Sequence, residues 1–315
     1  MKKISIVVPI YNEASGIPRL WQELRRIMGT LPYEAAYVFV NDGSTDASGA
    51  VLETLTADAA VTYIELSRNF GKEIATSAGI AYTQGDAVIV IDADLQHPPE
   101  LIREFVREWE AGADVVIGVR RPRKGEGFLR RMGSRGFASL MNSLGDAHAP
   151  VGATDFRLID KKVVDIFRTM HEHNRLTRSL IDWLGFTRVY IPFDAFERTD
   201  GVARYNYRKL FGTAFSAIVA HSRLPLYLAG YLGAGITLFA GFLGVFIIVE
   251  QLILDDPLGV VASGTAMLAI MILFLNGIVL MCLGLVALYI GTIHEEAAGR
   301  PLWVVRRHIN AGVVE

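Results

Sequence analysis

Residues 87–91 form an unbroken apolar run, AVIVI, which ends abruptly at two aspartates, Asp92 and Asp94. Such a run is typical of a strand buried on both faces, as parallel strands of an α/β sheet are. Open α/β sheets bind ligands beyond the carboxyl ends of their strands, where both carboxylates fall. Solvated loop acids are one interpretation of the pair. The other is a site for a hard cation, Mg²⁺ or Mn²⁺, which also takes phosphate oxygens as ligands.

Apolar runs alternate with helical patterns as far as about residue 118. This βαβα order predicts an α/β fold of Rossmann-like type, a mostly parallel sheet with helices on both faces. Strands are expected at residues 4–8, 37–40, 62–66, 87–91 and 114–118, and helices at about 16–28, 46–57, 72–83 and 99–111.

Polar residues follow three of these strands. They are Tyr11, Asn12 and Glu13, the segment 41–46 (NDGSTD), and the aspartate pair. The carboxyl ends of parallel strands share one edge of a sheet, so these groups should line a crevice of nucleotide size. Asp42 is equally compatible with binding a base and with forming a turn, and Asp46 or Ser44 is expected to cap the next helix.

The segment 67–73, SRNFGKE, also follows a strand and opens a helix. Lys72 is equally compatible with a ligand contact and with a solvated first-turn lysine. The chain contains no GxxxxGK[ST] motif, so P-loop ATPase chemistry is not supported.

Two long segments, 226–249 and 257–293, contain no Asp, Glu, Lys or Arg. Each is long enough for one membrane-spanning helix, expected at about 226–249 and 265–290; buried helices of a soluble core are the alternative. The link between them is acidic, whereas basic residues flank the outer ends. The chain is therefore expected to be a multi-pass protein of the cytoplasmic membrane, with the soluble domain and both termini in the cytoplasm. Small residues at 230–244 favour a homo-oligomer.

The net charge is only −2, so nucleic-acid binding is not indicated. The basic residues are nevertheless clustered in the sequence. Residues 118–135 carry seven basic side chains and one acid. An amphipathic helix at about 127–145, and a second at 205–225, are expected to lie on the bilayer, with packing against the soluble domain as the alternative. Arginine side chains of such helices would lie at the depth of the lipid headgroups, where they can bind an anionic lipid phosphate. The one cysteine, Cys282, allows no disulfide within the chain.

An ordered set of motifs resembles one family over nearly the whole chain. The motifs are IVVPIYNE, VNDGSTD, SRNFGKE, IDADLQHPPE, GATDFRLID and ERTDGVARYNYRKL, followed by two apolar C-terminal runs. It is the family-2 glycosyltransferases with the GT-A fold that act on polyprenyl phosphates, which include dolichyl-phosphate mannose synthases. The tail YIGTIHEEAAGRPLWVV is most similar to the bactoprenol glucosyltransferase (GtrB-like) branch.

The resemblance implies roles for particular residues. Nucleotide contacts would come from Pro9, Tyr11, Asn12, Glu13, Asp42, Lys72 and Asp92. Asp92, Asp94 and Gln96 would hold Mg²⁺ or Mn²⁺, and Asp155 would be a catalytic acid group near the sugar or the attacking oxygen. The acceptor phosphate would meet Arg120, Arg130, Arg131, Ser134, Arg198 and Arg204. The sequence departs from the family where Ala203 replaces Ser/Thr and where His97 replaces Asp, which leaves the role of His97 open.

The implied enzyme is an inverting glycosyltransferase that moves a sugar from a nucleotide diphosphate to polyprenyl (undecaprenyl or dolichyl) phosphate. UDP-glucose is the favoured donor; GDP-mannose, a UDP-N-acetylhexosamine and UDP-aminoarabinose are the alternatives. The implied organisation is a catalytic domain at 1–204, an interface helix at 205–225, two transmembrane helices within 226–292 and a cytoplasmic tail at 293–315.

Three other classes of protein fit the sequence less well. A processive polysaccharide synthase normally carries a QxxRW motif, which this chain lacks. A non-catalytic nucleotide-binding partner of a flippase would tolerate loss of the aspartate pair, which this chain keeps. A transporter needs polar groups within its spans, and the two predicted spans contain no charge.

Overall fold

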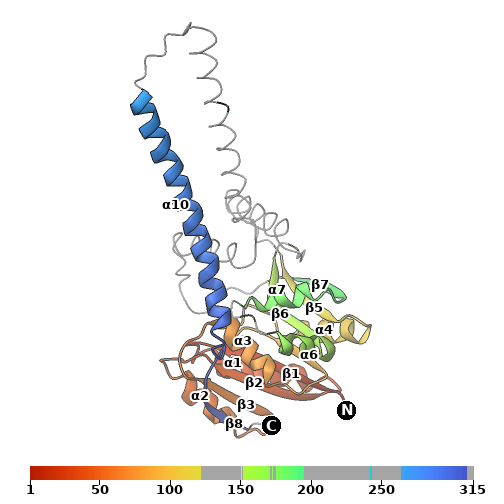
Figure 1. Cartoon of the computed structure of the whole chain (residues 1–315). Coiled ribbons are helices and arrows are strands. Elements are labelled where there is room, and N and C mark those ends of the chain that lie inside the picture. Colours follow the sequence, from red (N-terminus) through yellow and green to blue (C-terminus); the bar gives the residue numbers. More distant parts are fainter. Residues whose placement is uncertain are drawn as a thin grey trace. The chain divides into compact units, whose positions relative to one another are not determined.

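The computed structural model describes residues 1–121, 150, 152–170, 172, 175–194, 242 and 264–310. The chain divides into two compact units, the first made of Met1–Arg204 with Pro301–Glu315 and the second of Tyr205–Arg300. Figure 1 shows the first unit as a sheet with helices on both faces.

The first unit contains an eight-stranded sheet in the order β7-β5-β6-β4-β1-β2-β3-β8. Strand β6 runs antiparallel to β4 and β5, β8 runs antiparallel to β3, and the other pairs are parallel. The strands are β1 (Lys3–Ile10), β2 (Glu34–Asn41), β3 (Val61–Leu66), β4 (Ala87–Val90), β5 (Val115–Arg120), β6 (Ala153–Asp160), β7 (Arg188–Phe193) and β8 (Val305–Ile309).

The described helices of this unit are α1 (Ile17–Met28), α2 (Ser48–Leu55), α3 (Lys72–Ala81), α4 (Leu101–Glu110), α6 (Lys161–Thr169) and α7 (Thr177–Trp183). The predicted strands and helices up to residue 118 are confirmed, with ends that differ by a few residues. Helix α4 begins at Leu101 rather than 99 because two prolines, Pro98 and Pro99, precede it.

Side chains from both faces of the sheet are buried. On one face Ile6 and Val8 belong to a cluster that includes Leu20 and Leu24 of α1 and Phe105 of α4. On the other face Val7 belongs to a cluster that includes Ala78 of α3 and Phe167 of α6. Complete burial of one such aliphatic side chain contributes about 1.5–3 kcal/mol. The prediction of strands buried on both faces is therefore confirmed.

The strand order creates a switch point between β1 and β4. From β1 the chain continues through α1 to β2, the neighbour of β1 on one side. From β3 it returns through α3 to β4, the neighbour of β1 on the other side. Open α/β sheets bind their ligands beyond the carboxyl ends of the two strands at such a switch point, and this region is called the crevice.

Three strands were not among the predicted elements: the antiparallel strands β6 and β8, and β7, which pairs with β5 in parallel. Strand β6 separates β4 from β5, and β8 brings residues 305–309 alongside β3. The sequence of β8, VRRHI, contains three consecutive polar residues, and its partner strand lies more than 230 residues away. Neither local periodicity nor proximity in the chain indicated this pairing.

The second unit contains helix α10 (Gly264–Ala297), which covers the segment predicted as the second membrane span. Among the residues that the structure describes, no helix is both long and apolar enough to cross a membrane, so this predicted span is not confirmed. The other predicted span (226–249), the interface helices at 127–145 and 205–225, and the small-residue segment 230–244 lie outside the described residues, except for Phe242.

Candidate active site

Hydrogen bonds connect the loop after β1 to the loop after β2 at the crevice. Asn12, in a left-handed backbone conformation, accepts a hydrogen bond from Thr45 N at 2.8 Å and donates its own N–H to Ser44 Oγ at 3.0 Å. Glu13 N donates to Ser48 Oγ at 3.0 Å. These bonds fix the segment that follows Pro9, and they leave the ring of Tyr11 46% exposed beside it.

Asp46 connects the same loops. Its carboxylate accepts from Ala14 N at 3.2 Å and from Ser48 N at 2.9 Å, directly where α2 begins. The N-cap residue of α2 is Ala47, which makes no side-chain cap bond, so the prediction of Asp46 or Ser44 at that position is wrong. Asp46 still satisfies the N–H of Ser48 in the first turn, while Ser44 Oγ accepts from Asn12 N.

Asp42 lies at the base of the crevice and is 2% exposed. Its two carboxylate oxygens accept from Phe70 N at 2.7 Å and Gly71 N at 2.9 Å. Burial raises the pKa of this carboxyl, and the two backbone bonds oppose that rise. Asp42 thus holds the loop after β3 in place, and its predicted contact with a base stays a prediction.

Lys72 is the first residue of α3 and joins two carboxylates. Its Nζ lies 2.6 Å from Asp92 Oδ1 and 2.8 Å from Asp155 Oδ2. Burial lowers the pKa of Lys72, but the two carboxylates outweigh burial, so the pKa lies above its ordinary value. This lysine is therefore ion-paired at the crevice while its side chain stays 44% exposed, and its predicted contact with a ligand stays a prediction.

Asp155 reaches the crevice because β6 runs antiparallel beside β4. Val90, the last residue of β4, pairs with Arg157, which places Asp155 just beyond the strand end that precedes Asp92. Burial raises the pKa of Asp155, but the charge and hydrogen bond of Lys72, together with the charges of Arg157 and Arg178, outweigh burial and hold the pKa below the usual aspartate value. Asp155 is therefore an ionised carboxylate at neutral pH.

Asp92, Asp94 and His97 each offer one ligand atom, and these atoms all lie within 4.8 Å of one another. The chain turns sharply between the aspartates and His97, where Leu95 has a φ of 55° and Gln96 N donates to Asp94 Oδ1 at 3.1 Å. The structure thus brings the two predicted metal ligands together. Gln96, the third one predicted, has its Oε1 3.5 Å from Arg120 Nη1.

His97 was the residue whose role the sequence left open. Its ring is 7% exposed, stacks on Phe156 at 5.3 Å and meets Phe193 edge-on at 5.6 Å. Its Nδ1 is buried without a hydrogen-bond partner among the described residues and lies 3.8 Å from Asp92 Oδ2. Burial lowers the pKa of His97, which favours the neutral imidazole that metals bind. Two carboxylates beside an unpaired imidazole nitrogen fit a divalent cation.

The predicted acceptor-phosphate residues are only partly described. Arg120 ends β5 beside Gln96, at the same edge of the sheet as Asp92. Arg130, Arg131, Ser134, Arg198 and Arg204 lie outside the described residues.

The mixed α/β sheet, with an acidic cluster at its switch point, is of the GT-A-like type. The chain belongs to glycosyl transferase family 2, whose sequence profile matches residues 5–167. It is a glycosyltransferase, and the resemblance inferred from its motifs is confirmed.

Relatives are similar over nearly their full length. An uncharacterized glycosyltransferase of Synechocystis is 38% identical over 96% of this chain and 94% of its own. The SfII prophage-derived bactoprenol glucosyl transferase of Shigella flexneri is 34% identical over 97% of this chain and 98% of its own. A solved glucosyl-3-phosphoglycerate synthase from Mycobacterium tuberculosis, in complex with Mn²⁺ and UDP, is 17% identical over 70% of this chain and 78% of that one, with a TM-score of 0.46.

Proposed function

We propose that this enzyme transfers glucose from UDP-glucose to the phosphate of a membrane polyprenol, with inversion at the anomeric carbon. The observation that carries the proposal is the cluster of Asp92, Asp94 and Lys72 at the switch point of the sheet. The near full-length relatives named as bactoprenol glucosyl transferases support this choice of donor sugar and acceptor.

The donor's nucleotide would lie in the crevice after β1 and β2. Tyr11 presents an exposed ring against which a base can stack, and the tied loop at Asn12 and Glu13 shapes one wall. Pro9 fixes the end of β1 beneath that wall. The ammonium group of Lys72 stands where it can meet the negative charge of the diphosphate.

Asp92 and Asp94 would hold Mg²⁺ or Mn²⁺ together with a third donor, Gln96 or His97. When bound, that cation supplies Lewis-acid stabilisation of the charge on the diphosphate. The rest of the chemistry belongs to residues of the chain.

The reaction forms a bond between the anomeric carbon and an oxygen of the acceptor phosphate, while the bond from that carbon to the UDP oxygen breaks with its electron pair. The attacking oxygen is already an anion, so no strong general base is required. Asp155, whose pKa is held low by Lys72, is a weak base and is suited to positioning the sugar or Lys72. Arg120, with Arg130, Arg131, Ser134, Arg198 and Arg204, would hold the acceptor phosphate in line.

The lipid acceptor requires the enzyme to work at a membrane. Helix α10 exposes large apolar side chains, which include Leu268, Ile272, Leu283 and Ile290. We propose that the second unit attaches the enzyme to the cytoplasmic membrane as a homo-oligomer, with the first unit and both termini on the cytoplasmic side. Carbonate extraction of membranes, cross-linking, and protease protection of tagged termini in inverted vesicles test these three points.

The function is tested with purified full-length enzyme, radiolabelled UDP-glucose, undecaprenyl phosphate and Mg²⁺ or Mn²⁺. We expect radiolabel in a lipid product, and near-complete loss of transfer in Asp92→Asn and Asp94→Asn. GDP-mannose, UDP-N-acetylglucosamine and UDP-aminoarabinose serve as competing donors. A faster reaction with one of them would replace glucose in the proposal, and absence of transfer from every donor would overturn it.

A further inference from the structure

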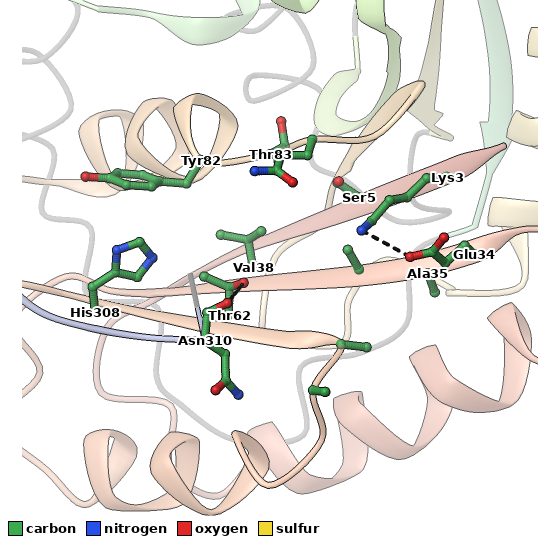
Figure 2. A pocket seen from close by; sticks show the side chains of 14 residues that line it. Lys3, Ser5, Glu34, Ala35, Val38, Thr62, Tyr82, Thr83, His308 and Asn310 are labelled. Atoms are coloured by element: carbon green, nitrogen blue, oxygen red, sulfur yellow. Dashed lines mark hydrogen bonds and ion pairs between the residues drawn. The ribbon is translucent and has the colours of Figure 1, made fainter. Parts of the chain in front are cut away.

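A second concave site lies at the opposite edge of the same sheet from Asp92. Figure 2 shows this cavity, of about 380 Å³, at the amino ends of β1, β2 and β3. The segment that follows the end of α3 at Ala81, residues 82–84, forms part of the cavity wall. The residues that matter for its chemistry are Lys3, Ser5, Glu34, Thr62, Tyr82 and His308.

Two polar atoms in the cavity wall have no hydrogen-bond partner among the residues that the structure describes. Ser5 Oγ belongs to a side chain that is 0% exposed, and it makes no hydrogen bond within the described part of the chain. His308 Nε2 is likewise shielded and unpaired there. Buried polar atoms in native proteins nearly always have a hydrogen-bond partner. Their position in the wall of one cavity points to a polar ligand.

The lining carries no net charge. Lys3 and Glu34 are its only charged side chains, and they neutralise each other with Nζ 3.1 Å from Oε1. Burial lowers the pKa of His308, which favours its neutral form. A phosphate or carboxylate ligand would find no unpaired cation among these lining residues, so the site favours an uncharged molecule.

The end of the cavity away from Lys3 is aromatic. The rings of Tyr82 and His308 meet edge-on with centroids 4.8 Å apart, and Figure 2 shows both facing the same space. Between the two ends the floor is made of small apolar residues and Val38. An apolar floor, an aromatic wall and a few neutral hydrogen-bonding groups are suited to a ring with one apolar face and several hydroxyls.

We propose that this cavity binds a small uncharged polyhydroxylated molecule of monosaccharide size. Ser5 Oγ and His308 Nε2 hydrogen-bond its hydroxyls, and the ring of Tyr82 packs against its carbon face. The site is separate from the Asp92 crevice and does not rest on the proposed function.

The test uses the full-length protein in lipid nanodiscs free of sugar-based detergent, because such detergents would compete. Saturation-transfer NMR measures binding of glucose, with uridine as a planar comparison ligand. UDP and Mg²⁺, which is diamagnetic, are present in excess to occupy the Asp92 crevice. We expect a glucose signal that UDP does not remove, and no signal of comparable strength from uridine.

Two variants at one position locate the site. Ser5→Ala removes the hydroxyl and Ser5→Val also fills the space, so both should weaken glucose binding by about tenfold or more. Both should still bind UDP, which verifies the fold, and Tyr82→Leu provides a second test from the aromatic wall. The proposal is overturned if wild-type protein gives no glucose signal, if UDP abolishes it, if uridine binds in preference, or if all three variants bind glucose unchanged.

Discussion

Lys72 Nζ lies 2.6 Å from Asp92 Oδ1, and this ion pair joins the start of α3 to the end of β4. The same ammonium group lies 2.8 Å from Asp155 Oδ2, so one cation holds a carboxylate from the loop after β4 and another from β6. In the proposed reaction this arrangement places a positive charge beside the departing diphosphate and prevents the two acids from repelling each other.

Lys72→Ala is expected to lower kcat/KM for UDP-glucose by about 10²-fold, the usual effect of losing one preorganised charged donor. Lys72→Arg keeps the charge and should retain a larger part of the activity. Steady-state kinetics with both variants measure the difference. Unchanged kinetics in Lys72→Ala would show that the lysine only fills space at the crevice.

Gln96→Ala and His97→Asn form a matched pair that identifies the third donor to the cation. The side chain that binds the cation should, when replaced, weaken Mn²⁺ affinity by about 10–100-fold, while the other variant stays close to wild type. Electron paramagnetic resonance of free Mn²⁺ gives the affinity without any need for turnover. We expect the larger loss in His97→Asn, because His97 Nδ1 has no hydrogen-bond partner in the described part of the chain, whereas Gln96 Oε1 faces Arg120. The reverse order would assign the position to Gln96.

The strands β1 to β5 and the approach of Asp92 to Asp94 were predictable because both follow from local patterns. Buried parallel strands are apolar throughout, and polar residues at their carboxyl ends meet at one edge. The link from Lys72 to Asp155 was not predictable in this way. It depends on β6 running antiparallel between β4 and β5, and an inserted strand changes the strand order without altering any local pattern. The pairing of β8 with β3 was also not predictable, because it too changes the strand order without altering a local pattern.

Arg306 of β8 is expected to position the loop that carries Lys72. Its guanidinium contacts Glu65 Oε1 at 3.1 Å and donates to the carbonyl oxygen of Ser67 at 2.6 Å, just before that loop. Arg306→Ala should raise KM for UDP-glucose several-fold with a smaller change in kcat, and Arg306→Lys should restore part of it.

Arg307→Ala is the matched control, because the neighbouring Arg307 pairs instead with Glu53 of α2. Both ion pairs are exposed, so both alanine variants should unfold within about 1 kcal/mol of wild type. An equal rise in KM in the two variants would indicate a general loosening of β8 and not a role for Arg306.

Asp114 is expected to make stability depend on pH in the acid range. Burial raises its pKa, but Lys162 and the N–H of Thr187, at 3.0 Å from Oδ2, outweigh burial and lower the pKa. The unfolded state therefore binds the proton more tightly. The stabilisation is complete above the unfolded pKa of about 3.9 and is lost as pH falls through the lower folded value.

Asp114→Asn should accordingly cost about 1–2 kcal/mol at pH 7, and this difference from wild type should shrink below about pH 4. Chemical unfolding followed by tryptophan fluorescence across that pH range measures it. Asp165→Asn, which alters an exposed carboxylate on α6, controls for the change in net charge. A difference that stays constant down to pH 3 would contradict the assignment.

Arg157 and Asp182 form a buried ion pair behind Asp155. Arg157 is 2% exposed, its Nη1 lies 3.7 Å from Asp182 Oδ1, and its Nη2 donates to the carbonyl oxygen of Thr154 at 3.1 Å. Asp182→Ala leaves a buried guanidinium without its carboxylate and should cost about 3–5 kcal/mol.

The double variant Arg157→Met with Asp182→Leu removes both charges and should recover most of the stability lost in Asp182→Ala, because well-packed apolar residues often replace a buried pair at little cost. Thermal unfolding of the three proteins measures the recovery.

Arg157 and Asp155 are two residues apart in β6 and share one face, so the charge of Arg157 also helps to keep Asp155 ionised. The double variant should therefore fold well yet transfer glucose more slowly than wild type. Full activity in a stable double variant would show that the pair serves packing alone.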